Sequence, residues 1–207
     1  MEIDIWSDVA CPWCAVGRAH LAKALATFRA EAGAPEVTVR WRSFELDPSA
    51  PPLREGDYVQ RLADKYGAPR AQMQQMVDEM EARGRALGIP FDFSDMKPGN
   101  TFDAHRLLHL AHENGVQDAL KDRLFRAYFG EGAAVGTHDA LVPLAVEVGL
   151  DEAEVRAVLE GDQYADAVRA DELAAQQLGV TGVPFFVVDR RYGISGAQPP
   201  EVLLQCL

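Results

Sequence analysis

The sequence predicts an α/β fold in which a small sheet is interrupted by a large, all-helical insertion. Residues 2–7 and 37–44 alternate between apolar and polar side chains, as half-buried strands do. Between residue 53 and about Gly161 the apolar residues recur at helical spacing instead. A short apolar run returns at 185–188, bounded by turn residues. The helical part therefore separates two groups of strands.

The first elements are strand, helix and strand. The helix runs from Pro12 to about Ala32, with an apolar face at i, i+3, i+4 and i+7 formed by Leu21, Ala24, Leu25 and Phe28. Gly33 and Pro35 follow it and are typical of a helix end. Two strands joined by one helix form a parallel pair with a right-handed crossover.

The insertion begins after the proline-rich stretch 48–52 and contains several helices with one apolar face each. Asn100 or Thr101 is expected to cap one of them, and Asp151 with Glu154 resembles a capping box. Their apolar faces contain Met73, Met76, Val77 and Met80; Ala104, Leu107, Leu108 and Ala111; Val116, Leu120, Leu124 and Tyr128; Leu141, Leu144, Ala145 and Val148; Val155, Val158 and Leu159.

The C-terminal elements complete the sheet. We expect a helix over 162–178, a strand over 185–188, a hairpin at 189–191 with an edge strand at 192–195, and a last helix from Pro199 or Pro200. This order is that of a thioredoxin fold with an insertion. The predicted domains are 1–47 with 162–207, and the helical subdomain 48–161.

Composition limits the class of protein. A chain of 207 residues that is 48% hydrophobic buries a substantial core. Its net charge of −12 argues against nucleic acid and anionic membrane surfaces as partners. Three cysteines are too few for a disulfide scaffold. No signal segment or long apolar run is visible, so we expect a cytoplasmic protein.

Cys11-Pro12-Trp13-Cys14 lies where the first strand passes into the first helix, after the turn that contains Asp8. A Cys-x-x-Cys motif at such a junction is typical of a redox site. Free N–H groups and the dipole at the helix start favour a thiolate at Cys11, with a pKa of about 3.5–7.5. Pro12 suits the first helical position. Cys14, one turn further, is the expected resolving thiol.

A zinc site is the alternative interpretation of this motif. It needs four ligands, and the sequence has no second Cys-x-x-Cys and no finger-like histidine spacing. His105, His109 and His112 share one helix face, which we expect to be solvated or to face the other subdomain. We therefore predict no metal and no cofactor other than the cysteine pair itself.

Val183-Pro184 is the second part of the predicted site. A proline at the start of a strand, after Thr181-Gly182, is where this fold places a cis peptide bond beside the cysteine pair. Val183 would then offer its backbone to an extended peptide or to glutathione. The alternative is an ordinary trans proline that begins an edge strand.

Taken together, the motifs resemble the DsbA-family oxidoreductases of the FrnE type. The resemblance is carried by Ser7-Asp8-x-x-Cys11-Pro12-Trp13-Cys14, Phe44-Glu45-Leu46-Asp47-Pro48, Asn100-Thr101-x-x-Ala104-His105-Arg106-Leu107, Gly182-Val183-Pro184-Phe185-Phe186 and Ser195-Gly196-Ala197-Gln198. It implies thiol–disulfide oxidoreductase or isomerase activity on proteins or small thiols. It also implies a nucleophile at Cys11, a resolving cysteine at Cys14 and a cis-proline at Pro184.

Two positions depart from the better-known relatives. Thioredoxins and periplasmic DsbA proteins place a buried acid where this chain has Ile5, so proton transfer at Cys14 lacks its usual helper. Asp8 or a water is the candidate to replace it. Periplasmic DsbA has histidine at the position of Trp13. We therefore expect a potential between those of thioredoxin and DsbA, within about −270 to −120 mV.

Two other functions are considered. Kappa-type glutathione transferases and 2-hydroxychromene-2-carboxylate isomerases resemble this architecture but carry serine at the position of Cys11. A non-enzymatic, chaperone-like role would use the methionine face of the insertion. In either scheme Trp13 and Phe44 are candidate substrate contacts, and glutathione is a possible reductant. Cys206, the third cysteine, is expected to be a buried packing residue.

Overall fold

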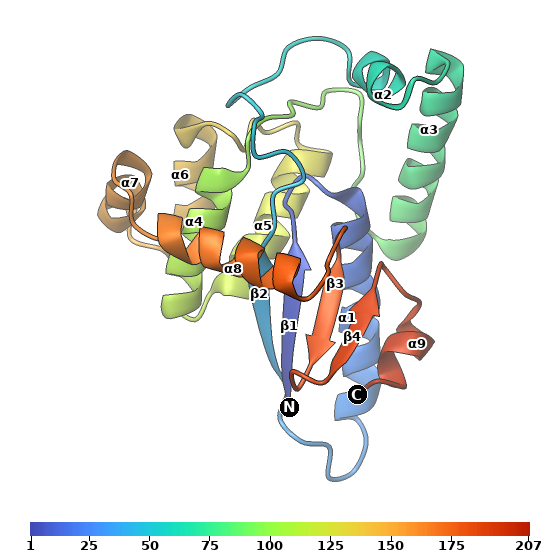
Figure 1. Ribbon diagram of the computed structural model, residues 1–207, viewed down its shortest axis with the longest axis vertical. Coiled ribbons are helices and arrows are strands. Elements are labelled where there is room, and N and C mark those ends of the chain that lie inside the picture. Colours follow the sequence, from blue (N-terminus) through green and yellow to red (C-terminus); the bar gives the residue numbers. More distant parts are fainter.

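The computed structural model describes residues 1–207 and contains one mixed sheet of four strands in the order β2-β1-β3-β4 (Figure 1). β1 (Glu2–Ser7) is parallel to β2 (Thr38–Ser43). It is antiparallel to β3 (Phe185–Val188), which pairs with the edge strand β4 (Tyr192–Ser195). The predicted parallel pair and the predicted C-terminal hairpin are both confirmed.

Nine helices complete the fold, and most of them lie between β2 and β3 in the sequence. α1 (Pro12–Arg29) connects the parallel strands, and α9 (Pro200–Leu204) follows β4. The helices between β2 and β3 are α2 (Tyr58–Tyr66), α3 (Arg70–Leu87), α4 (Phe102–Glu113), α5 (Gln117–Gly130), α6 (His138–Glu147), α7 (Glu152–Glu160) and α8 (Ala165–Gln177). None of the helices is long and apolar enough to cross a membrane.

The alternation along β1 divides the core between the two faces of the sheet. Ile3 and Ile5 pack with residues of α1 and α9, including Leu21, Phe28 and Leu203. Trp6 points to the other face and packs with Ala175, Val180 and Val187. Ile5 is thus fully enclosed by apolar side chains at the position where relatives have a buried acid.

The largest core cluster contains 33 buried residues and joins the insertion to the start of α1. Besides side chains of the inserted helices, it includes Val9, Cys11, Cys14 and Val16. The cysteine pair is therefore packed between the sheet domain and the helical segment. The domain boundaries predicted after residues 47 and 161 stay a prediction, because this core is continuous across them.

The insertion is less helical than predicted, because residues 88–101 form no helix. Two prolines, Pro90 and Pro98, lack the N–H that a helix would need there. The segment instead bonds to other loops, for example through Arg54 N–H to the Pro98 carbonyl at 2.7 Å. It still contributes Phe91, Phe93 and Met96 to the core.

Local expectations about single residues had mixed outcomes. Met73 and Met80 are buried core residues, and only Met76 of that face is exposed, at 41%. The methionine face therefore offers little surface for unfolded clients. Asn100 caps the start of α4, because its side-chain oxygen accepts a hydrogen bond from the Phe102 N–H at 2.8 Å. Cys206 is partly exposed, so the expectation of a buried packing residue was wrong, because the short α9 ends beside it.

Candidate active site

The start of α1 holds the two cysteines of the motif. Cys11 occupies the N-cap in an extended conformation, and Pro12 is the first helical residue. The Cys11 carbonyl accepts hydrogen bonds from the N–H groups of Cys14 and Ala15, at 3.0 and 3.4 Å. Cys11 is 5% exposed and Cys14 is fully buried, so Cys11 is the more accessible of the two thiols.

The two thiols differ strongly in acidity. The hydrogen bond with the Cys14 thiol lowers the pKa of Cys11, and the N–H groups of Cys14 and Trp13 lower it further. Burial acts in the opposite direction and raises this pKa. Burial raises the pKa of Cys14 well above its ordinary value, and the hydrogen bond with Cys11 raises it further. Cys11 is therefore the more acidic thiol of the pair, and burial favours the protonated form of Cys14.

The Val183–Pro184 peptide bond is cis and lies against this pair. The Cys11 thiol donates to the Val183 carbonyl oxygen at 3.5 Å. Gly17, one turn after Cys14, allows α1 to approach this loop closely. A Cβ on Gly17 would lie 2.9 Å from Pro184 Cγ and 3.3 Å from Phe186 Cζ. Only a residue without a side chain fits between α1 and this loop.

Two aromatic side chains were candidates for substrate contact, and the structure places them differently. Trp13 is 43% exposed beside the cysteines, and the Arg83 guanidinium of α3 lies 5.0 Å from its ring centre. Phe44 is half-buried and packs against the small core cluster on the α8 side of the sheet. Trp13 is therefore available to a substrate, whereas packing accounts for the position of Phe44.

Asp8 lies in the turn before the motif and is almost completely buried. Its carboxylate accepts the N–H groups of Leu46 and Ala10, at 2.7 and 3.2 Å, and lies 3.4 Å from His105 Nε2. Burial raises the pKa of Asp8, but His105 and the Leu46 N–H outweigh it and hold that pKa below its ordinary value. Asp8 is therefore a fixed negative charge close to Cys11, whose pKa it raises.

Lys121 of α5 is a site residue that the sequence reasoning missed. It is fully buried, its ammonium donates to the Ser7 carbonyl at 3.4 Å, and it lies 5.0 and 5.6 Å from the ring centres of Phe125 and Trp41. Burial lowers the pKa of Lys121 to about 8, while the charges of Cys14, Asp8 and Cys11 act against this. The i, i+4 spacing to Phe125 was the available signal that Lys121 faces inward.

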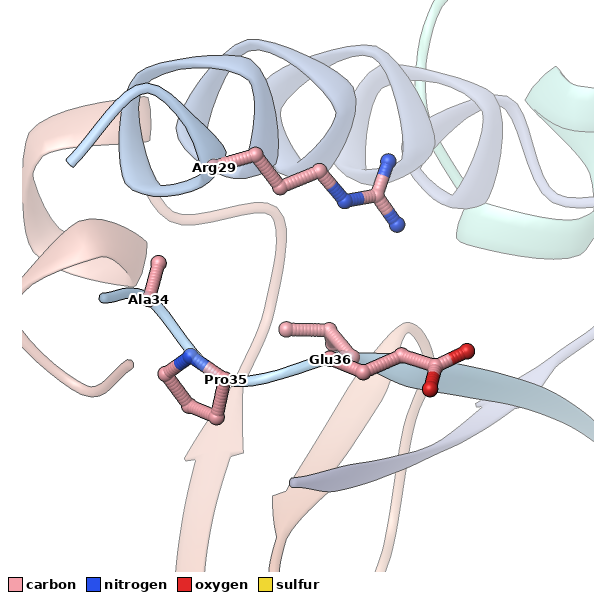
Figure 2. A pocket seen from close by; sticks show the side chains of 5 residues that line it. Arg29, Ala34, Pro35 and Glu36 are labelled. Atoms are coloured by element: carbon pink, nitrogen blue, oxygen red, sulfur yellow. The ribbon is translucent and has the colours of Figure 1, made fainter. Parts of the chain in front are cut away.

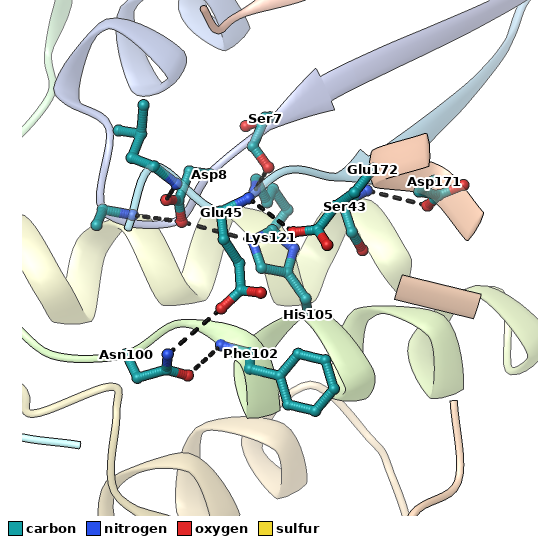
Figure 3. A network of polar contacts seen from close by, with 12 residues as sticks. Ser7, Asp8, Ser43, Glu45, Asn100, Phe102, His105, Lys121, Asp171 and Glu172 are labelled. Atoms are coloured by element: carbon teal, nitrogen blue, oxygen red, sulfur yellow. Dashed lines mark hydrogen bonds and ion pairs between the residues drawn. The ribbon is translucent and has the colours of Figure 1, made fainter. Parts of the chain in front are cut away.

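Buried polar groups without partners concentrate in this region. Four buried side-chain polar atoms make no hydrogen bond: Ser7 Oγ, His105 Nδ1 and Nε2, and Arg61 Nη2. Ser7 precedes Asp8, and His105 contacts Asp8. Figure 3 shows Ser7, Asp8, His105 and Lys121 gathered from the end of β1, α4 and α5. Such groups are rare in folded proteins, so their grouping beside the cysteine pair calls for an explanation.

The rest of α4 is more buried than expected. His109 contacts Asp171 Oδ2 at 3.3 Å, so two of the three histidines face the sheet domain and only His112 is solvated. Arg106 is also buried, and its guanidinium binds Asp103 and the Gly161 carbonyl. No group of three or more His, Cys, Asp or Glu side chains is close enough to hold a metal ion.

Comparison with known proteins agrees with this geometry. Residues 2–207 match the model of the DSBA-like thioredoxin domain. The chain belongs to this family. The crystal structure of the probable DsbA oxidoreductase SCO1869 from Streptomyces coelicolor is 50% identical and superposes with a TM-score of 0.93, over 100% of this chain and 88% of that one. The resemblance to DsbA-family oxidoreductases and the predicted fold class are both confirmed.

Two further relatives of this DSBA-like protein differ in what they show. The uncharacterized protein YwbO of Bacillus subtilis (strain 168) is 32% identical over 190 residues, which is 91% of this chain and 86% of YwbO. The structure of a 2-hydroxychromene-2-carboxylate isomerase is 16% identical, with a TM-score of 0.74 over 100% of this chain and 94% of that one. The isomerase thus shares the fold with its insertion.

Two pockets lie at opposite ends of α1. One, of about 490 Å³, opens beside the active-site loop and is lined by Asp8, Ala10, Tyr58 and Arg61 among others, although neither cysteine borders it. The other, of about 460 Å³, lies where α1 ends, with Arg29 facing Pro35 and Glu36 across it (Figure 2). A helix of 18 residues is about 27 Å long, so this second pocket is remote from the cysteines.

Proposed function

We propose that this DSBA-like protein exchanges disulfides through Cys11 and Cys14, with Val183 and Pro184 holding the substrate against Cys11. One observation carries the proposal. The pKa values of two thiols in one helical turn are shifted in opposite directions, and the more acidic thiol, Cys11, contacts the Val183 carbonyl. A thiolate that is ready to attack and a thiol that stays protonated until needed are the two functions that exchange requires.

The chemistry proceeds in two displacements. The Cys11 thiolate attacks one sulfur of a substrate disulfide; the substrate S–S bond breaks and its other sulfur leaves as a thiolate, which takes up a proton. Cys14 then loses its proton and attacks Cys11 Sγ, so that the Cys11–Cys14 bond forms and the second substrate thiolate leaves. The substrate is reduced by two electrons and the cysteine pair is oxidised; the reverse sequence oxidises a dithiol.

The local structure supports a peptide as substrate. Val183 is partly buried at the edge of the site, and its carbonyl is the group that a bound chain would share with Cys11. Trp13 adds an exposed aromatic surface next to it. Proteins or small molecules with accessible disulfides are the proposed partners, and glutathione is a proposed reductant. We also propose a cytoplasmic location, which cell fractionation tests.

Cysteine variants test the exchange mechanism. Cys11→Ser should lower insulin reduction with dithiothreitol to the uncatalysed rate, because no second exposed thiolate lies at the site. Cys14→Ser should accumulate a mixed disulfide at Cys11, detected by mass spectrometry, because nothing resolves it. Cys206→Ser is the matched control and should behave as wild type. If Cys14→Ser accumulates no adduct with any disulfide, the mechanism is wrong.

A second candidate is a glutathione-dependent transferase or isomerase, which the shared fold of the 2-hydroxychromene-2-carboxylate isomerase brings into consideration. Conjugation of glutathione to a chlorinated aromatic compound would support it. The presence of cysteine at both ends of the motif favours disulfide exchange instead. A transferase would retain its activity in Cys14→Ser, whereas an oxidoreductase would not.

A further inference from the structure

The buried ammonium of Lys121 has few polar partners. A lysine ammonium has three donors, and this one makes a single hydrogen bond, of 3.4 Å, to the Ser7 carbonyl. The side chain has no exposed surface and forms no ion pair with a carboxylate. A buried charge with so few partners costs stability, because its hydration is lost and little replaces it.

The surroundings of Lys121 connect it to Cys14. Ser7, whose carbonyl binds Lys121, also carries a buried hydroxyl that lowers the pKa of Cys14. Arg18, one turn after Cys14 on α1, binds Asp118 and Asp122, which flank Lys121 on α5. The two helices therefore lie side by side here, and the charge of Lys121 lowers the pKa of Cys14. The rings of Phe125 and Trp41 contact the Lys121 ammonium as well. Lys121 and Cys14 are both fully buried titratable groups of this region.

The position of Ile5 makes this cluster important. Residue 5 is fully buried among apolar side chains and cannot exchange a proton with Cys14. Asp8, the other candidate, is held ionised by His105 and the Leu46 N–H, so it is a poor proton acceptor. Lys121 is the remaining buried group whose charge lowers the pKa of Cys14.

We propose that Lys121 is the positioning residue that ionises Cys14 when Cys14 resolves the mixed disulfide. This rests on the proposed disulfide exchange. The reactive state is a Cys14 thiolate beside a Lys121 ammonium. It forms when the ammonium stabilises the thiolate as the proton of the thiol passes to the substrate thiolate released in the first displacement. Cys14 Sγ then bonds to Cys11 Sγ, and the substrate thiolate departs.

Other charges also act on this cluster and set the pH range. Cys14 and Cys11 of α1 and Asp8 of the preceding turn favour the charged form of Lys121, whereas Arg18 of α1 disfavours it. His105 of α4 also interacts with both Asp8 and Lys121. With a pKa of about 8, Lys121 is mostly an ammonium at neutral pH, so its positive charge is present when Cys14 must ionise.

The test is Lys121→Met, which keeps the length of the side chain and removes its charge, with Lys23→Met on the exposed face of α1 as the matched control. In a single turnover with an aromatic disulfide, the first coloured thiol reports attack by Cys11 and the second reports resolution by Cys14. We expect Lys121→Met to slow the second release by about tenfold or more at neutral pH, corresponding to a shift of one pH unit in its profile. Lys23→Met should match wild type.

Stability separates this role from a packing role. Removing a poorly partnered buried charge should leave the protein as stable as wild type or more stable. A lysine with a depressed folded-state pKa penalises the folded state at low pH, so the stability of wild type relative to Lys121→Met should rise as pH increases from about 8 to about 10.5. Lys121→Gln provides a second variant should the methionine not fold.

Three results would overturn the proposal. In the first, the second release keeps the wild-type rate and pH profile in both variants. In the second, both releases slow equally while the stability of the variant falls. In the third, the stability of wild type relative to Lys121→Met does not change with pH. Failure of the proposed function itself looks different, because wild type would then release no second thiol before any variant is compared.

Discussion

A methyl group added to Gly17 tests whether the close contact between α1 and the Val183–Pro184 loop matters for activity. In Gly17→Ala the new Cβ would lie 2.9 Å from Pro184 Cγ, whereas carbon atoms in contact are normally about 3.5–4.0 Å apart. The loop or the helix must therefore retreat by roughly 0.6–1 Å. Cys11 and Val183 lie on the two sides of this gap, so their 3.5 Å contact changes with it.

Two opposing effects decide the stability of Gly17→Ala. Overpacking costs about 1–3 kcal/mol, whereas alanine stabilises a helix interior by about 1 kcal/mol relative to glycine. The net loss is then between about zero and 2 kcal/mol, which lowers the melting temperature by at most about 8 °C. The exchange rate should fall much more, by about tenfold to a hundredfold, because reacting groups misplaced by 1 Å lose that much.

Thermal unfolding and insulin reduction, both on the reduced protein, measure the two effects. Gly130→Ala is the control, since its Cβ would lie 2.5 Å from the Pro90 carbonyl oxygen at the end of α5. It should lose stability without losing exchange activity per folded molecule. A Gly17→Ala protein that is more stable than wild type and exchanges at the wild-type rate would refute the reasoning.

Two further predictions concern the ionisation of the site. The Cys11–Cys14 couple should equilibrate with glutathione at a potential within about −270 to −120 mV, and a value below that of thioredoxin would contradict this. Asp8→Asn should lower the pKa of Cys11, because the Asp8 charge raises it, and should make the couple more oxidising by stabilising the reduced form. Thiolate absorbance measured against pH detects the shift, and Asp64→Asn on α2 is the control. An unchanged or higher pKa of Cys11 in Asp8→Asn would show that the Asp8 charge does not act on Cys11.

Local patterns in the sequence were sufficient for the elements and for the reactive sulfur. Alternation at 2–7 and 37–44 marked the parallel strands, and a Cys-x-x-Cys at a helix start marked Cys11 and Cys14. The helix was predicted to end at Ala32 and ends at Arg29. These predictions succeed because they depend on the properties of neighbouring residues, which spacing reveals.

The same patterns failed where burial is set by distant segments. The histidine face of α4 could be solvated or face the other subdomain by its spacing alone, yet α4 is buried on all sides from Ala104 to Ala111. Spacing shows which residues share a helix face, but it does not show how many other elements pack around that helix. The unwound segment 88–101 was missed for a related reason, since its bonds run to other loops.

The linear order of residues was enough to assign the strands, the helices and a nucleophile whose acidity arises from its own helix. Folding decided what surrounds that nucleophile: Lys121 reaches Ser7 across 114 positions, and Val183 reaches Cys11 across 172. The acidity of Cys11 is a local property, because the Cys14 thiol and the backbone N–H groups of the same turn lower its pKa. The ionisation of Cys14 is a property of the packed interior, where the loss of water makes each distant charge effective.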